Sequence, residues 1–298
     1  MSPPSAPRRK RSPATAANPG GVAPVTLEMV AQASGVSPST VSRILNGTAT
    51  VSAAKQAAVQ EAIQALGFRP NPVARGLAGG RTLSIGVLTQ TISSPFYGEA
   101  LHGIETRLES AGYIPLFVSG HWHEDDERKA LDALMSRRVD GLIVLAGRLP
   151  NAALQAYAKV VPMVVVGRAL SGPGLFSLGF DNRAGAHLAT RHLTEAGHRR
   201  IAFISGEPNH ADALDRLAGY QQALDEAGIA HDPDLVIPGD YTEVGGLAAV
   251  HRLLERKTAF TALFAANDQM AIGAALGLYR QRIRVPDDVS LVGFDDLA

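Results

Sequence analysis

The pattern of hydrophobic and polar positions divides the chain into two parts that predict different elements. From about residue 25 to residue 67, apolar residues recur at helical spacing over three short segments. From residue 83 onward, short apolar runs alternate with longer amphipathic segments. Residues 1–24 show neither period and are rich in Pro, Ser, Ala and Arg, which predicts a disordered tail.

The first part predicts a helical hairpin and a third helix. Thr26 is a suitable N-cap for a first helix of residues 27–33, and Ser37 followed by Pro38 is typical of the start of a second helix, which ends near Leu45. A third helix is expected over residues 53–66. Two short helices joined by a glycine-containing turn predict a helix-turn-helix, whose second helix enters the major groove of DNA. A purely structural hairpin is the alternative interpretation.

The outer face of the second helix is short and hydrogen-bonding. Ser39, Thr40 and Ser42 carry small hydroxyl groups, and Arg43 is the single charge on this face. Short hydroxyls allow a close approach to phosphates and base edges, and arginine can bind guanine O6 and N7 with two hydrogen bonds. These residue types therefore favour DNA contact.

The charge of the chain is unevenly distributed. Up to Gly80 there are eight Lys and Arg against two Glu, whereas the remainder holds 20 basic and 26 acidic residues. A basic head suggests a polyanionic partner. Half of the basic residues lie in one cluster, residues 8–11, so charge alone is weak support.

The second part predicts an α/β fold. Strand-like runs that are apolar throughout, separated by helical segments, are typical of parallel sheets covered on both faces. A break over residues 168–180 is expected to divide two doubly wound subdomains. Such sheets bind ligands beyond the carboxyl ends of their strands. The residues that follow the predicted strands there are Ser93, Ser94, Pro95, Phe96, Tyr97, His121, Trp122, Arg168, Asp181, Glu207, Asn267, Asp268, Asp295 and Asp296.

This set of side chains suits a small polyhydroxylated ligand. Aromatic rings can cover C–H faces, while amide, carboxylate and guanidinium groups bind hydroxyls. Each member is alternatively a helix cap or a loop residue, and Asp181 and Asp268 in particular fit N-cap or first-turn positions. The pair of His121 and His123 lacks further ligands that would indicate a metal site.

Residues 25–87 resemble the DNA-binding head and hinge of the LacI/GalR family of bacterial transcription regulators. The resemblance is carried by VTLEMVAQASGVSPSTVSRILNG and by VSAAKQAAVQEAIQALGFRPNPVARGLAGGRTLSIGV. It implies a helix-turn-helix domain over residues 25–70 and a hinge helix over residues 71–80. The DNA-binding residues that it implies are Pro38, Ser39, Thr40, Ser42, Arg43, Asn71 and Leu77. Of these, Leu77 matches a leucine that wedges into the minor groove and kinks the operator.

Residues 81–298 resemble the periplasmic-binding-protein-like effector-binding and dimerisation domain of the same family. The similar segments are VVVGR, FDNRAGAHLATRHLTEAGHRRIAFISG, RLAGY, FAANDQMAIGA and RVPDDVSLVGFDD, in the same order. The effector-binding residues that this resemblance implies are Phe96, Tyr97, Arg168, Arg216, Asn267 and Asp295. Family members continue beyond the G-F-D-D motif with a further strand and helix, so we expect this chain to be shortened at its C-terminus.

Together these features predict a homodimeric repressor that binds palindromic operator DNA under the control of a sugar-like effector. No P-loop, G-x-S-x-G or H-E-x-x-H motif supports an enzyme, and no cofactor is expected. Neither a secretory signal nor a membrane-length apolar run occurs, which predicts a cytoplasmic location without a membrane partner. The alternatives are a soluble sugar-binding protein without regulatory DNA binding and a DNA-binding protein with an architectural body. The identity of the effector, the operator sequence and the choice between induction and corepression stay open.

Overall fold

The computed structural model describes residues 25–48, 50–69, 80–145, 147–208 and 210–297. The chain divides into two compact units, Met1–Thr82 and Leu83–Ala298, which we call the head and the body. The expected tail over residues 1–24 and the hinge residues Asn71 and Leu77 lie outside the described residues.

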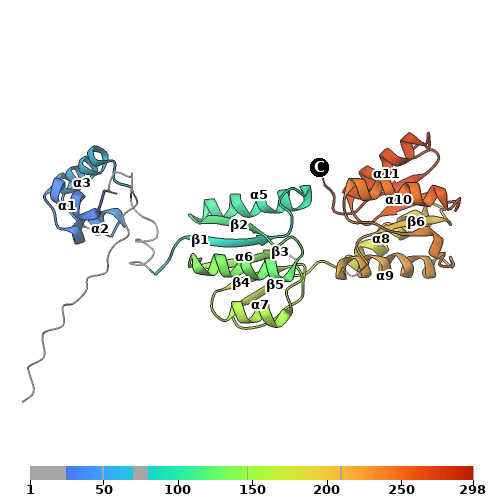
Figure 1. Ribbon diagram of the computed structural model, residues 1–298, viewed down its shortest axis with the longest axis horizontal. Helices are drawn as coiled ribbons and strands as arrows, with labels where there is room; N and C mark the ends of the chain where they lie inside the picture. Colours follow the sequence, from blue (N-terminus) through green and yellow to red (C-terminus); the bar gives the residue numbers. More distant parts are fainter. Residues whose placement is uncertain (1–24, 49, 70–79, 146, 209, 298) are drawn as a thin grey trace, which may run out of the picture. The chain divides into compact units, whose positions relative to one another are not determined.

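The head is helical, as the sequence predicts. Its helices are α1 (Leu27–Ser34), α2 (Pro38–Leu45) and α3 (Ala53–Leu66) (Figure 1). The Thr26 hydroxyl accepts a hydrogen bond from the backbone N–H of Met29, and the Ser37 hydroxyl accepts one from that of Thr40. These contacts satisfy N–H groups that have no partner within their own helices. Gly35 ends α1 with φ of 68°, a backbone conformation that glycine adopts without strain.

The core of the head is built from small apolar residues. Val30, Val41 and Val59, one from each helix, are fully buried, and Ala31 and Ala62 are nearly so. These side chains draw the three helices close together. Ser39, Arg43 and the ring of Pro38 remain exposed on α2.

The first lobe of the body surrounds a five-stranded parallel sheet in the order β2-β1-β3-β4-β5. Figure 1 shows α5 on one face of this sheet and α6 and α7 on the other. The strands are β1 (Ser84–Thr89), β2 (Ile114–Ser119), β3 (Gly141–Leu145), β4 (Met163–Val166) and β5 (Leu175–Leu178), and the helices are α5 (Pro95–Ser110), α6 (Glu124–Ser136) and α7 (Asn151–Ala158).

The second lobe surrounds a four-stranded parallel sheet in the order β7-β6-β8-β9. Here α8 and α9 cover one face and α10 and α11 the other (Figure 1). The strands are β6 (Ile201–Ser205), β7 (Val236–Pro238), β8 (Ala262–Ala265) and β9 (Ser290–Val292). The helices are α8 (Asn182–Glu195), α9 (Ala211–Glu226), η1 (Pro233–Leu235), α10 (Glu243–Glu255) and α11 (Asp268–Arg280).

The two parallel sheets confirm the predicted fold class, and they place the division between the lobes. Residues 175–178 lie inside the expected break, yet they form β5 and pair with β4 in the first sheet. The first lobe therefore ends after Leu178. The alternation of strand and helix gave no sign of this, because no helix separates β4 from β5.

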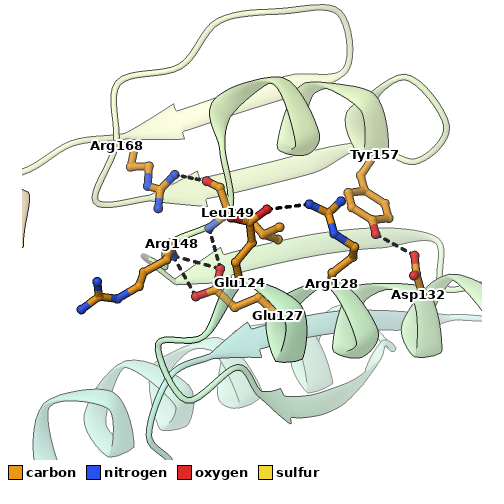
Figure 2. A network of polar contacts seen from close by, with 8 residues as sticks. All are labelled: Glu124, Glu127, Arg128, Asp132, Arg148, Leu149, Tyr157 and Arg168. Atoms are coloured by element: carbon orange, nitrogen blue, oxygen red, sulfur yellow. Dashed lines mark hydrogen bonds and ion pairs between the residues drawn. The ribbon is translucent and has the colours of Figure 1, made fainter.

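A buried carboxylate holds the loop that follows β3 (Figure 2). Glu127 on α6 is 1% exposed, and it accepts hydrogen bonds from the backbone N–H groups of Arg148 and Leu149 at 2.8–2.9 Å. A Cβ atom on Gly147 would lie 2.7 Å from the Glu127 Oε2 atom. The carboxylate and the adjacent glycine thus fix the path of residues 147–149.

Replacing this carboxylate should destabilise the body. We expect Glu127→Ala to lower the free energy of unfolding by about 2–4 kcal/mol, because the buried N–H of Leu149 and the part-buried N–H of Arg148 lose their carboxylate acceptor. Thermal unfolding followed by circular dichroism measures the effect. Glu109→Ala, at an exposed position on α5, is the matched control, and equal losses in the two variants would contradict the structural role of Glu127.

Candidate functional site

The outer face of α2 presents the head's predicted DNA-binding residues. Pro38, Ser39 and Arg43 are exposed, whereas Thr40 and Ser42 are half-buried. The Ser37 hydroxyl lies 2.9 Å from both the Ser39 and the Thr40 hydroxyls, so this end of α2 carries a small cluster of hydroxyl groups. Within the described residues the exposed Arg43 guanidinium forms no hydrogen bond or ion pair, so this group is available to a ligand.

The body contains a cavity of about 380 Å³, lined by residues from both lobes. We call it the effector cavity. It lies beyond the carboxyl ends of β1, β6 and β8, where an α/β sheet is expected to bind ligands. Five of the six predicted effector-binding residues line it, namely Phe96, Tyr97, Arg216, Asn267 and Asp295. The sixth, Arg168, lines a neighbouring compartment.

Arg216 on α9 is the most connected side chain of the cavity. It is 8% exposed, and its Nε donates to the Asn182 Oδ1 atom at 2.9 Å. Its other nitrogens contact the carbonyl oxygen of Ala266 and, at 3.5 Å, the Asp295 carboxylate. The guanidinium also lies 3.8 Å from the centre of the Phe294 ring. These contacts hold the charged group in a fixed orientation.

Aromatic rings from both lobes form one wall of the cavity. Trp122, in the loop after β2, meets His210 in the second lobe edge-to-face, with ring centres 4.6 Å apart. Tyr97 lies 6.4 Å from Trp122, and Tyr241 lies 5.8 Å from His210. Such rings provide flat apolar surfaces against which the C–H face of a sugar can pack.

Two polar atoms in this wall lack a hydrogen-bond partner in the described part of the protein. They are the Nδ1 atom of His210 and the hydroxyl of Tyr241, and both are buried. Burial is also the main reason that the pKa of His210 is lowered and that of Tyr241 raised. The His210 Nδ1 atom lies 3.9 Å from the Asp212 carboxylate, which is too long for a hydrogen bond. Buried polar atoms without a hydrogen bond are costly, so both atoms are suited to bind complementary groups of a ligand.

Sequence reasoning missed His210, Tyr241, Asp212 and Asp240, all of which line the cavity. A signal for them was present, because they follow β6 and β7 as the other candidates follow their strands. Among the residues after β6, the strand-end rule predicts only Glu207. The loops after these strands are longer than one or two residues, so the side chains that reach the cavity lie further along the chain.

Several predicted residues have structural roles. Asp181 caps α8 by accepting from the N–H of Ala184 at 2.9 Å, and it does not line the cavity. Asn267 lines the cavity but also caps α11, since its Oδ1 accepts from the N–H of Met270 at 3.0 Å. Asp268 accepts from the N–H of Leu297 at 2.8 Å and so holds the segment after β9. Asp181 is therefore a helix cap only, whereas Asn267 both caps α11 and lines the cavity.

Two protein-family profiles match the sequence. The profile for bacterial regulatory proteins of the lacI family matches residues 26–71, and the profile for periplasmic binding proteins and the sugar-binding domain of the LacI family matches residues 82–298. The chain belongs to the LacI family. It is therefore a DNA-binding transcription regulator and not an enzyme.

Named relatives agree with this assignment. The chain is 40% identical to the HTH-type transcriptional regulator GalR of Escherichia coli K12 over 91% of its own length and 80% of that protein. It is 36% identical to the catabolite control protein A of Priestia megaterium, over 91% of this chain and 82% of that protein. Among solved structures, the lac repressor dimer bound to operator and an anti-inducer shares 32% identity with a TM-score of 0.81, covering 92% of this chain and 83% of that one.

The Asp295 carboxylate should make the stability of this LacI-family protein depend on pH. Burial raises the pKa of Asp295 from its ordinary value of 3.8 to about 6, although Arg216 opposes the shift. Between these values the folded protein holds a proton that the unfolded chain does not, so stability is lost as the pH rises through about 6. The loss amounts to about 2–3 kcal/mol.

Thermal unfolding of wild type and Asp295→Asn between pH 4 and 7 measures this contribution. The variant cannot ionise at this position, so its stability should vary less over that window. Asp296→Asn, which changes an exposed neighbour, is the control. Parallel pH profiles for wild type and Asp295→Asn would contradict the assignment.

Proposed function

We propose that this regulator binds a palindromic operator as a homodimer and that a sugar-like effector in the body controls its affinity for that operator. The observation that carries the proposal is the presence, in one chain, of a helix-turn-helix with an exposed arginine and a two-lobed body with a polar and aromatic cavity. The match of the lacI-family profile to the head leaves no support for a sugar-binding protein without DNA binding.

In the head, α2 supplies the base contacts and Arg43 is the principal specific contact. Pro38 offers apolar contact only, while Ser39, Thr40 and Ser42 bind phosphates or base edges. Asn71 and Leu77 belong to the hinge helix, with Leu77 inserted into the minor groove at the operator centre. The expected domain limits follow: a tail over residues 1–24, a DNA-binding domain over 25–70, a hinge over 71–80 and an effector-binding body over 81–298.

In the body, Arg216, Asn267 and Asp295 bind ligand hydroxyls, and Phe96 and Tyr97 cover its apolar face. Relatives support a sugar, since the structure of one, the regulator CelR, is a complex with cellobiose. That structure shares 35% identity and a TM-score of 0.64, over 92% of this chain and 83% of that one. A ligand that contacts both lobes stabilises their closed arrangement, and coupling to DNA is reciprocal.

A homodimer is supported by the surface of α11. Ile272, Leu276 and Tyr279 follow one another at spacings of four and three residues and are all exposed, at 56%, 43% and 77%. Such an apolar strip on one helix face is typical of a subunit interface. No described helix is both long and apolar enough to cross a lipid bilayer. We propose that the dimer acts in the cytoplasm, where its operator is.

Arg43→Ala should remove sequence discrimination while retaining weak, salt-sensitive DNA binding. The loss of one bidentate guanine contact costs about 1–3 kcal/mol, or roughly 5- to 150-fold in affinity for the operator over random DNA. Fluorescence anisotropy with an operator obtained by selection and with a scrambled duplex measures both affinities. Arg43→Lys is the matched control because it keeps the charge without the planar fork. If both affinities fall by the same factor, Arg43 does not read bases.

Arg216→Gln should abolish the response to effector without weakening operator binding in its absence. The measurement screens neutral, phosphorylated and acidic mono- and disaccharides for those that shift the operator affinity of the wild type, and then repeats the titration on the variant. Arg199→Gln, at an exposed position outside α11 and the cavity, is the control. An Arg216→Gln protein that binds operator and still responds would show that the effector site lies elsewhere.

A further inference from the structure

A second compartment adjoins the effector cavity in the body. It measures about 480 Å³, and Gly167, His210 and Asp212 line both spaces. Its other lining residues are Gly147, Arg148, Asn151, Arg168 and Ala211. We call it the arginine compartment, because two guanidinium groups line it.

Arg168 is the stronger indication of a ligand in this compartment. Its side chain is half-buried, and burial lowers its pKa. It donates to the carbonyl oxygen of Leu149 (Figure 2). It also lies 3.5 Å from the Asn151 Oδ1 atom. These partners are neutral, and within the described residues no carboxylate forms an ion pair with it. Glu127 and Asp212 attract it electrostatically without forming an ion pair, and the Glu127 carboxylate already accepts from two backbone N–H groups. A half-buried cation without a directly bound anion favours binding of one.

Arg148 adds a second cation with donors to spare. One of its terminal nitrogens pairs with Glu207 in the second lobe at 2.8 Å, and a guanidinium has five N–H donors. The compartment also lies at the starts of α7 and α9, whose first residues, Asn151 and Ala211, are among its lining. Neither start carries a side-chain cap. The dipole of α7 therefore adds positive potential to that of the arginines, whereas Asp212 in the first turn of α9 offsets the dipole of that helix.

The effector cavity has the opposite charge pattern. Asp212, Asp240, Glu207 and Asp295 line it, and its one arginine, Arg216, already contacts Asp295. Carboxylates bind hydroxyl groups well and repel anions. Asp212 lines both the effector cavity and the arginine compartment, where its carboxylate can accept a hydrogen bond from a hydroxyl group of a bound sugar. An anionic substituent is thus disfavoured in the effector cavity and better placed in the arginine compartment, where two arginines and one carboxylate, Asp212, are among the lining residues.

We propose that the effector is a sugar that carries an anionic group, phosphate or carboxylate. The ring occupies the effector cavity, and the anion lies between Arg148 and Arg168. This inference rests on the proposed function, since it names the ligand class of the same site. Arg168, which lines no part of the effector cavity, becomes the residue that distinguishes an anionic sugar from a neutral one.

The test is calorimetric titration of the full-length protein with inorganic phosphate and, separately, with acetate, at constant ionic strength set with sodium chloride. We expect saturable binding of one of them, weakened about tenfold or more by Arg168→Gln because a charge-assisted hydrogen bond is lost. Arg148→Gln, at a more exposed position, should weaken binding in the same direction and stays informative if Arg168→Gln unfolds. Arg199→Gln, an exposed substitution, should leave binding unchanged.

Saturable binding of phosphate identifies the effector as a phosphorylated sugar, and saturable binding of acetate identifies it as a sugar acid. Binding no stronger than that of chloride, or equal binding in wild type and both site variants, overturns the proposal. Operator affinity, measured on the same preparations, separates this failure from that of the proposed function. If the wild type binds operator but neither anion, this proposal is wrong, the proposed function stands, and the effector is a neutral sugar.

Discussion

The ligand-facing surface of the second lobe depends on the placement of one buried guanidinium. Arg216 reaches from α9 to Asn182 on α8, to the end of β8 through the carbonyl of Ala266, and to Asp295 in the segment after β9. A charge that is 8% exposed is stable only with such partners. The same contacts bring the carboxyl ends of the second sheet together as one polar surface. A ligand that binds there meets groups whose positions are already fixed, which lowers the entropic cost of binding.

The head satisfies a different constraint, since a helix that enters a DNA groove must be narrow outside and packed inside. Its core uses valines and alanines, which bring α1, α2 and α3 close together. Capping by Thr26 and Ser37 compensates for helices of only eight residues, α1 and α2, which are too short to be stable alone. The hydroxyl cluster at the start of α2 belongs both to the cap and to the surface proposed to meet DNA.

Much of this architecture follows from local pattern. The sequence predicts the helices of the head and both parallel sheets, because hydrophobic periodicity and helix caps are encoded by neighbouring residues. It also predicts which residues follow the strand ends, and so the cavity positions of Phe96, Tyr97, Asn267 and Asp295. The features that the sequence did not predict depend on tertiary contacts. The pairing of β5 with β4 is set by the sheet, and His210 and Tyr241 reach the cavity from loops whose course the sequence does not specify. Arg168 follows its strand as expected, but its contact with the Leu149 carbonyl turns it into the neighbouring compartment.

The central claim is that this LacI-family chain reads a symmetric DNA sequence through α2. The most direct test is selection of random duplex DNA on the purified protein, with Arg43→Ala selected in parallel. The account predicts enrichment of a palindrome whose half-sites are spaced for two copies of the head, and loss of that enrichment in the variant. Recovery of no common sequence by the wild type, or of the same palindrome by the variant, would contradict it.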